Sequence, residues 1–298
     1  MKNKSLLKGY FFVVLSAIFY GLMPLMAKFL YRDGVNSITL VFLRNILAVP
    51  ILLFLSLKTK GTIKTDLKTF GKISFIAIMG CCITPLLLFT SYNHIPSGTA
   101  TIIHFIYPAI VVIGEWIIFK SKLTAGRFLS VLLCISGIAL FYNPSESINA
   151  TGALYALLSG ITYAIYVISL HMLKDKNISI FTLGFYLTLV CSFVMLFVCI
   201  LTNQLALPTS ILGWLLSLLF AFTLNIGAVL LFQKGTFLIG GSKAAILSTF
   251  EPITSIIAGT IILKEGLSNL TIIGSILVIG AGVLIAVCDI NKKTSSSS

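Results

Sequence analysis

Long apolar segments, separated by short polar loops, recur along the entire chain of 298 residues. A membrane-spanning α-helix needs about 20 largely apolar residues, and ten segments approach or exceed that length. They cover residues 9–31, 36–57, 71–93, 97–119, 126–142, 151–173, 180–202, 211–233, 242–263 and 269–288. Only 10% of the residues are charged, whereas soluble domains have about 25%. The sequence therefore predicts an all-α integral membrane protein with ten transmembrane helices.

The positions of the basic residues predict how the chain is oriented. If the N-terminus is cytoplasmic and the chain crosses ten times, all but four of the 21 Lys and Arg residues lie on the cytoplasmic side. Arg32 and Lys264 lie outside, while Lys28 and Arg44 lie within helices. This bias predicts a multi-pass protein of the plasma (inner) membrane with both termini in the cytoplasm. The basic clusters at helix ends suit a bilayer surface, so we expect no nucleic-acid partner.

Identical residues recur in the two halves at a nearly constant offset of 143 to 145 residues. The offset pairs Tyr20 with Tyr163, Pro108 with Pro252, and Lys120 with Lys264. It predicts one repeat over residues 1–145 and a second over 146–290, followed by a disordered tail over 291–298. Because five helices cross the membrane an odd number of times, the second repeat is expected to be inverted. Inverted repeats commonly form secondary transporters, with the substrate site near the midplane between the halves.

Ionisable side chains within the predicted helices are functional candidates, because a charge in the bilayer core is costly. Glu251 could carry a proton or bind a substrate amine, or a polar contact could instead tie together a helix kink at Pro252. Arg44 could clamp a substrate carboxylate or phosphate, or form an internal ion pair. Lys28 lies nearer a helix end, where it could extend to the lipid headgroups.

Several other polar and aromatic side chains lie at similar depth. His104 and Tyr107 are three residues apart and therefore share a helix face, which could line a polar cavity or pack against other helices. The candidate residues for substrate binding or the substrate pathway are Tyr20, Arg44, His104, Tyr107, Tyr163, Tyr166, Asn225 and Glu251. Pro108 and Pro252 are predicted helix hinges, since proline removes a backbone hydrogen bond.

Motifs at matching positions of the two halves resemble those of a known family. They are Phe250-Glu251-Pro252 and Lys264-Glu265-Gly266-Leu267-Ser268 in the second half, and Tyr107-Pro108 and Lys122-Leu123-Thr124 in the first. Over about residues 8–290 the chain resembles the EamA branch of the drug/metabolite transporter superfamily. It departs at Ser121, where this family usually has a glutamate, and carries Glu115 within the helix instead. The resemblance implies a gradient-driven carrier of amino acids or related metabolites.

The sequence lacks the usual signatures of enzymes and metal sites. It has no P-loop, HExxH or GxSxG motif, and its six cysteines lie in apolar segments without CxxC spacing. We expect no enzymatic activity, catalytic residue, metal or cofactor. The leading hypothesis is a secondary active transporter that moves a small polar metabolite by alternating access, with protons as candidate coupling ions. A membrane enzyme for lipid-linked substrates and a flippase are the alternatives, and homodimerisation is left open.

Overall fold

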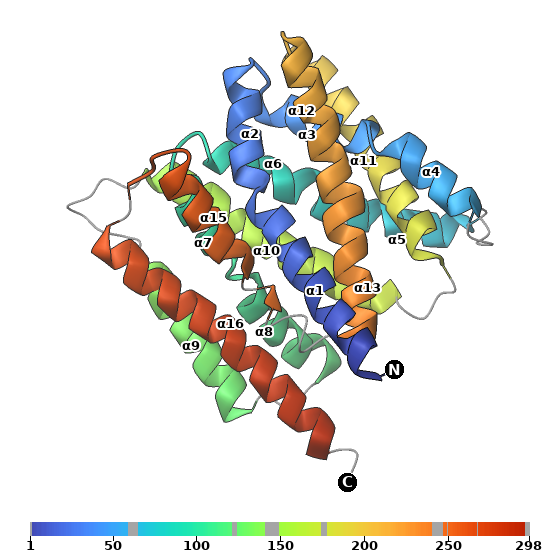
Figure 1. Cartoon of the computed structure of the whole chain (residues 1–298). Coiled ribbons are helices and arrows are strands. Elements are labelled where there is room, and N and C mark those ends of the chain that lie inside the picture. Colours follow the sequence, from blue (N-terminus) through green and yellow to red (C-terminus); the bar gives the residue numbers. More distant parts are fainter. Residues whose placement is uncertain are drawn as a thin grey trace.

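In the computed structural model, the described part of the chain consists of helices joined by short loops (Figure 1). The described residues are 2–58, 65–120, 124–140, 149–173, 178–239, 247–248, 250–266 and 268–295. Seven helical stretches in them are long and apolar enough to cross a membrane: Leu7–Arg32, Ser37–Lys58, Leu67–Ser91, Ser97–Ile118, Ala150–Leu170, Ile180–Leu201 and Ile211–Phe232. The prediction of an all-helical, multi-pass membrane protein is confirmed.

Three shorter apolar helices overlap the remaining predicted segments. They are α9 (Ala125–Ala139), α15 (Phe250–Ile261) and the stretch Ile272–Leu284 within α16 (Asn269–Ser295). Since none of the three stretches reaches the usual length of a span, the count of ten membrane crossings stays a prediction. α16 continues to Ser295 and so extends into the segment that the sequence predicts as a tail.

Two of the long stretches, α10 (Ala150–Leu173) and α11 (Ile180–Leu201), are uninterrupted helices, and the other five are broken into shorter segments. Four of the broken stretches begin the chain: α1 (Lys2–Gly21) with α2 (Met23–Arg32), α3 (Ser37–Ile46) with α4 (Val49–Lys58), α5 (Leu67–Ala77) with the π-helix η1 (Ile78–Ile83) and α6 (Thr84–Ser91), and α7 (Ser97–His104) with α8 (Tyr107–Phe119). The fifth contains α12 (Ile211–Ala221), the π-helix η2 (Phe222–Ala228) and α13 (Val229–Ile239).

Proline explains where most of these interruptions fall. A proline is the second residue of the segment that follows the break in α2, α4, α6 and α8: Pro24, Pro50, Pro85 and Pro108. Proline lacks the backbone N–H and its ring clashes with the carbonyl four residues earlier, so the preceding helix cannot continue unchanged. Of the two predicted hinges, Pro108 directly follows the break between α7 and α8. Pro252 is the third residue of α15, and residue 249 just before that helix lies outside the described residues.

The helices pack in an arrangement that joins the two halves of the chain. α1 packs against α13 and α15, α10 packs against α6, α7 and α8, and α11 packs against α3, α4 and α5. α9 and α16 pack along each other at one side of the molecule (Figure 1). Glycines permit the closest approaches: a Cβ on Gly137 would lie 2.8 Å from the Gly274 carbonyl oxygen, which suits a membrane interior where packing and not water drives association.

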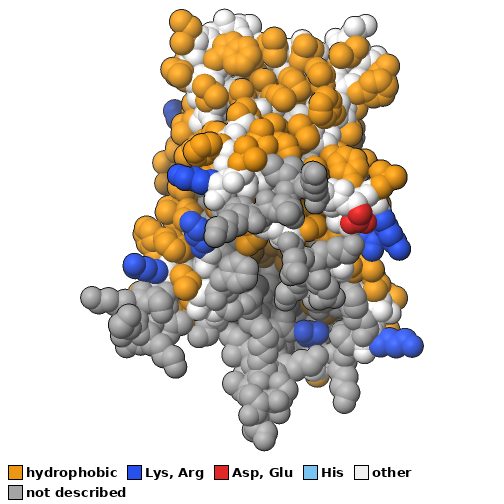
Figure 2. Space-filling view, turned by 90° about the vertical axis from the view of Figure 1, so that its right-hand side faces the viewer, with side chains coloured by type: hydrophobic (Ala, Val, Ile, Leu, Met, Phe, Trp, Pro, Cys, Tyr) orange, Lys and Arg blue, Asp and Glu red, His pale blue; other side chains and the backbone are white. Residues whose placement is uncertain are grey.

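The outer surface of the bundle is apolar. Large hydrophobic side chains are exposed on several helices, among them Phe11, Phe54, Phe193, Phe197 and Ile276. In Figure 2 hydrophobic side chains cover the upper part of one face almost without interruption. Since a protein in water rarely exposes so large an apolar surface, this surface is the one that contacts lipid.

Candidate functional site

A cavity of about 160 Å³ lies among the broken helices. One water molecule needs roughly 10–15 Å³ of such space, so the cavity has room for on the order of ten waters or a small organic solute. All eight residues that the sequence predicts for substrate binding line it: Tyr20, Arg44, His104, Tyr107, Tyr163, Tyr166, Asn225 and Glu251. These residues come from distant parts of the chain, and the fold brings them together at one place.

One wall of the cavity is a cluster of aromatic rings. The Tyr163 ring centroid lies 4.7 Å from Tyr107, 5.3 Å from His104 and 5.4 Å from Tyr166. The His104 ring is held in place by a hydrogen bond, in which its Nδ1 lies 2.8 Å from the Ser159 hydroxyl. Rings in contact in this way lose little further freedom when a ligand binds, and they offer both apolar faces and hydroxyl groups to it.

The wall continues onto η1, where Gly80 provides space for an aromatic ring. A Cβ on Gly80 would collide with ring carbons of Tyr166, so only glycine lets this ring lie against the backbone. Thr84 follows η1 and its hydroxyl lies 2.8 Å from that of Thr162. Single-turn π-helical segments are frequent at functional sites, and both η1 and η2 contribute residues to the cavity.

Arg44 brings a positive charge to the cavity and has no ion-pair partner among the described residues. Its guanidinium lies over the Phe89 ring, 5.8 Å from the centroid, and its buried Nε has no hydrogen-bond partner in the described structure. The ion pair that the sequence left open for Arg44 is absent among the described residues. Asn225 in η2 donates a 2.6 Å hydrogen bond to the Arg44 carbonyl and so fixes the backbone that carries the guanidinium.

Glu251 brings a carboxyl group to the same cavity. It lies in the first turn of α15, where the positive end of the helix dipole favours a carboxylate. Its carboxylate forms no ion pair within the described part of the chain, with Arg44 or with any other basic residue. A basic and an acidic side chain therefore line one cavity without an ion pair between them among the described residues.

The cavity also contains residues that the sequence did not single out. Cys81 in η1, Thr84 in α6 and Thr188 in α11 line it, together with apolar residues such as Met23 and Leu88. Cysteine, threonine and methionine within an apolar segment look like ordinary packing residues. The one signal that could have found the first two was Pro85, which marks a disturbed helix just as Pro108 does.

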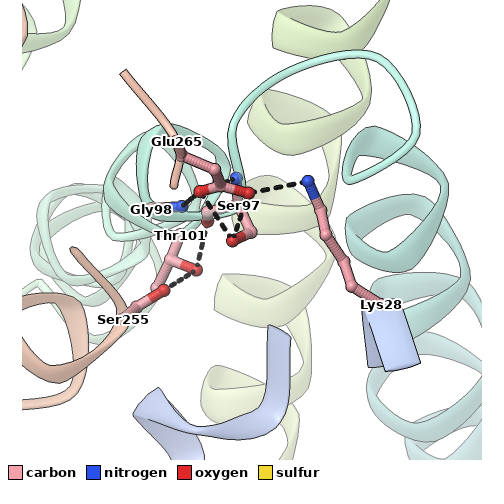
Figure 3. A network of polar contacts seen from close by, with 6 residues as sticks. All are labelled: Lys28, Ser97, Gly98, Thr101, Ser255 and Glu265. Carbon is pink, nitrogen blue, oxygen red and sulfur yellow. Dashed lines mark hydrogen bonds and ion pairs between the residues drawn. The ribbon is translucent and has the colours of Figure 1, made fainter. Parts of the chain in front are cut away.

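A second polar cluster lies apart from the cavity, at the start of α7 (Figure 3). Glu265 accepts hydrogen bonds from the Ser97 amide at 2.9 Å and the Gly98 amide at 3.4 Å. The Ser97 hydroxyl donates to the same carboxylate, and the Lys28 Nζ forms a 2.7 Å ion pair with it. Lys28 therefore pairs with a carboxylate instead of extending to the headgroups.

Glu265 is partly buried, with 10% of its side chain exposed. Burial alone would raise the pKa of Glu265, but the hydrogen bond from Lys28, those from Ser97 and the charge of Lys28 outweigh burial and hold the pKa below its ordinary value. The amides at a helix N-terminus are a natural site for an anion. The charged form of Glu265 is thus the one that this cluster stabilises.

The fold and the cavity define a multi-pass helical membrane protein with an internal cavity that contains a few polar side chains. The sequence profile described as "EamA-like transporter family" matches residues 7–143 and again residues 150–287. The chain therefore belongs to the EamA-like transporter family, and the resemblance inferred from its motifs is confirmed.

Three related proteins match this chain over most of both sequences. An uncharacterized transporter of Archaeoglobus fulgidus is 26% identical, covering 86% of this chain and 91% of that protein. The uncharacterized transporter sll1319 of Synechocystis sp. is 25% identical over 98% and 97%, and the uncharacterized transporter YcbK of Bacillus subtilis is 27% identical over 92% and 91%. A crystal structure of another protein superposes with a TM-score of 0.65 at 14% identity, covering 97% of this chain and 98% of that one, which shows a shared fold.

Proposed function

We propose that this protein is a secondary active transporter that moves a small polar metabolite, an amino acid or a related compound, by alternating access. The observation that carries the proposal is the cavity in which Arg44 and Glu251 lie unpaired. A charge without a partner is costly inside a membrane protein. Its cost falls when a ligand supplies the opposite charge, and a zwitterion supplies both.

The proposed chemistry of binding follows from the two charges and the rings. Arg44 presents donors in a planar fork that suits a carboxylate, and Glu251 presents acceptors that suit an ammonium group or a transported proton. The tyrosine wall of Tyr107, Tyr163 and Tyr166 would contact the rest of the solute. Membership of a transporter family supports the same conclusion.

Alternating access in this proposal rests on two inverted repeats, residues 1–145 and 146–290. Three matched features support them. α1 packs against α13 and α15, and its counterpart α10 packs against α6 and α8, which are the counterparts of those helices. The π-helices η1 and η2 occupy equivalent positions, and the equivalent lysines Lys120 and Lys264 both have positive φ, 51° and 56°.

The proposed location is the plasma membrane, with both termini in the cytoplasm. The distribution of Lys and Arg supports this orientation. The start of α1 and the end of α16 also lie toward the same end of the molecule in Figure 1, as an even number of crossings requires. Protons remain the proposed coupling ion and a homodimer the proposed assembly.

Uptake into proteoliposomes tests the proposal. The purified full-length chain would be reconstituted and supplied with radiolabelled amino acids and small carboxylates, with and without a pH gradient. We expect uptake of at least one of these solutes, stimulated by the gradient. Failure of the entire panel would refute the proposed substrate class.

The proposed proton role of Glu251 has its own test. Glu251→Gln is expected to abolish stimulation by the pH gradient while solute exchange between two equal pools persists. Asp33→Asn is the matched control, because Asp33 is a half-buried carboxylate outside the cavity that accepts hydrogen bonds from the Thr209 and Ser210 amides. Equal stimulation in wild type and Glu251→Gln would show that Glu251 carries no proton.

A further inference from the structure

The described lining of the cavity extends toward the end of the bundle where α10 ends and α11 begins. Beyond its polar centre the cavity is lined by Leu170 near the end of α10 and by Ile180, the first residue of α11. α10 begins at the opposite end of the bundle. The loop before α7 lies at this same end, because a Cβ on Gly152 near the start of α10 would lie 2.6 Å from His94 in that loop. The Glu265 cluster lies at that second end, at the start of α7.

The Glu265 carboxylate joins three parts of the chain at this end. Lys28 approaches it from α2 on one side, and the first amides of α7 approach it from the other (Figure 3). Glu265 itself follows α15, after a turn in which Lys264 has a φ of 56°. Gly259 in α15 leaves room for the carboxylate, because a Cβ there would lie 2.5 Å from Oε2.

The network continues behind Glu265 toward the interior. Ser97 accepts a 2.9 Å hydrogen bond from Thr101 at its carbonyl, and Ser255 of α15 donates a 3.1 Å bond to the Thr101 hydroxyl. Ser97, Thr101 and Ser255 are each about 1% exposed. α7 and α15 are thus held together by buried polar contacts at the end of the bundle away from the cavity opening.

We propose that Glu265, with Lys28 and the start of α7, is the gate residue that closes the extracellular end of the transport pathway. This rests on the proposed function, because a gate implies a solute pathway that opens alternately at each end. The described lining of the cavity extends to the ends of α10 and α11 that the positive-inside rule assigns to the cytoplasm, and in this proposal the Glu265 cluster closes the other end. Opening outward requires α2, α7 and the end of α15 to separate, which breaks these contacts.

The first repeat lacks a glutamate at the position equivalent to Glu265. The repeat offset of 144 residues that pairs Lys120 with Lys264 places Ser121 opposite Glu265. A serine offers no negative charge to a lysine or a helix N-terminus. The state closed to the outside and open to the cytoplasm is therefore the resting state in this proposal.

The native Cys81 makes the gate measurable without a known substrate. Among the cysteines whose side chains the structure describes, Cys81 lines the cavity and the other four are buried. With every other cysteine replaced by serine or alanine, a charged, membrane-impermeant methanethiosulfonate reports access to Cys81 from each side. Right-side-out and inside-out vesicles expose the two sides in turn.

We expect Cys81 of the otherwise unchanged protein to react faster in inside-out vesicles. Glu265→Gln is expected to raise its rate of reaction from the outside about tenfold, which corresponds to about 1.4 kcal/mol of lost closure. Gly259→Ala should act in the same direction although it changes no charge, because its Cβ displaces the carboxylate. Asp66→Asn is the control, since it removes an exposed carboxylate at the start of α5, a helix that the proposed opening does not separate.

A second measurement tests directly whether the two sides of the contact must separate. Lys28→Cys combined with Glu265→Cys, in a chain without other cysteines, would be joined by a bifunctional maleimide, which should block solute exchange. If the joined protein exchanges solute at the uncrosslinked rate, or if Glu265→Gln and Gly259→Ala both leave outside labelling unchanged, the gate is refuted. A labelling change in a protein that transports none of the panel would instead refute the proposed substrate class and leave the gate standing.

Discussion

Replacing Arg44 with methionine should weaken substrate binding while leaving the fold intact. The guanidinium forms no ion pair within the described residues, and its buried Nε has no partner. Removing it therefore leaves no opposite charge unpaired. The contact that is lost is with the Phe89 ring, worth roughly 0.5–1 kcal/mol at a solvated site, and methionine retains part of the packing.

The expected effect on binding is much larger. A hydrogen bond to a charged group contributes about 1.5–3 kcal/mol, which corresponds to about a tenfold to hundredfold increase in the concentration needed for half-maximal uptake. The assay is uptake of the best carboxylate-bearing solute of the panel, with the melting temperature of the purified protein measured in parallel. A lowered melting temperature with unchanged half-saturation would refute this reasoning, because it would make Arg44 a structural residue.

Lys28→Met, unlike Arg44→Met, should destabilise the fold, because it leaves Glu265 without its cation. Since the pair is partly exposed, we expect a loss of roughly 1–2 kcal/mol of stability, measured as a lower melting temperature. Gly80→Val should displace Tyr166 from the cavity wall and reduce uptake at least about tenfold, with expression level as the control. The pH dependence of stability follows from Glu265, whose pKa is lowered in the folded protein. The ionised Glu265 stabilises the fold fully above its unfolded-state pKa of about 4.5. This stabilisation is lost as the pH falls through the lower pKa of the folded state. The difference in melting temperature between wild type and Glu265→Gln should therefore stay constant from pH 5 to 8 and shrink below pH 4, and a difference that changes near neutral pH would contradict the assignment.

The polar residues of the cavity could be predicted because a polar or charged side chain is costly in the hydrocarbon core of a membrane. Arg44 and Glu251 are more than 200 residues apart in the sequence, yet both sit within apolar segments where a charge is tolerated only beside other polar groups or water. Since such polar surroundings are scarce in a helical bundle, residues of this kind collect at one place. The eight predicted residues do so.

The helix breaks were only partly predictable. Pro108 was recognised as a hinge because its counterpart Pro252 follows an intramembrane glutamate. Pro24, Pro50 and Pro85 are also the second residue of the helix that follows a break. No charged residue lies next to them in the sequence to mark them as candidate hinges. The π-helix η2 has no proline within it, so no local feature of the sequence predicts it.

The pairing of Lys28 with Glu265 could not be read from the sequence for a different reason. A lysine near a helix end can extend to the headgroups or turn inward, and local hydropathy favours neither. The choice depends on a loop more than 200 residues away folding onto the start of α7. Only the three-dimensional arrangement brings the carboxylate, the ammonium and the helix amides to one point.

The two charged places in this protein differ in a way that bears on how it works. At the start of α7 the charges are matched, with Lys28 and two backbone amides on one carboxylate, so this contact stabilises one conformation. In the cavity no ion pair joins Arg44 and Glu251 within the described protein, so in the proposed mechanism a bound solute supplies the partners that these two side chains lack. A solute that binds both cavity charges can offset the cost of separating the matched contact, because each interaction has a magnitude of a few kcal/mol. Such a balance is what a carrier needs if binding is to shift it between states.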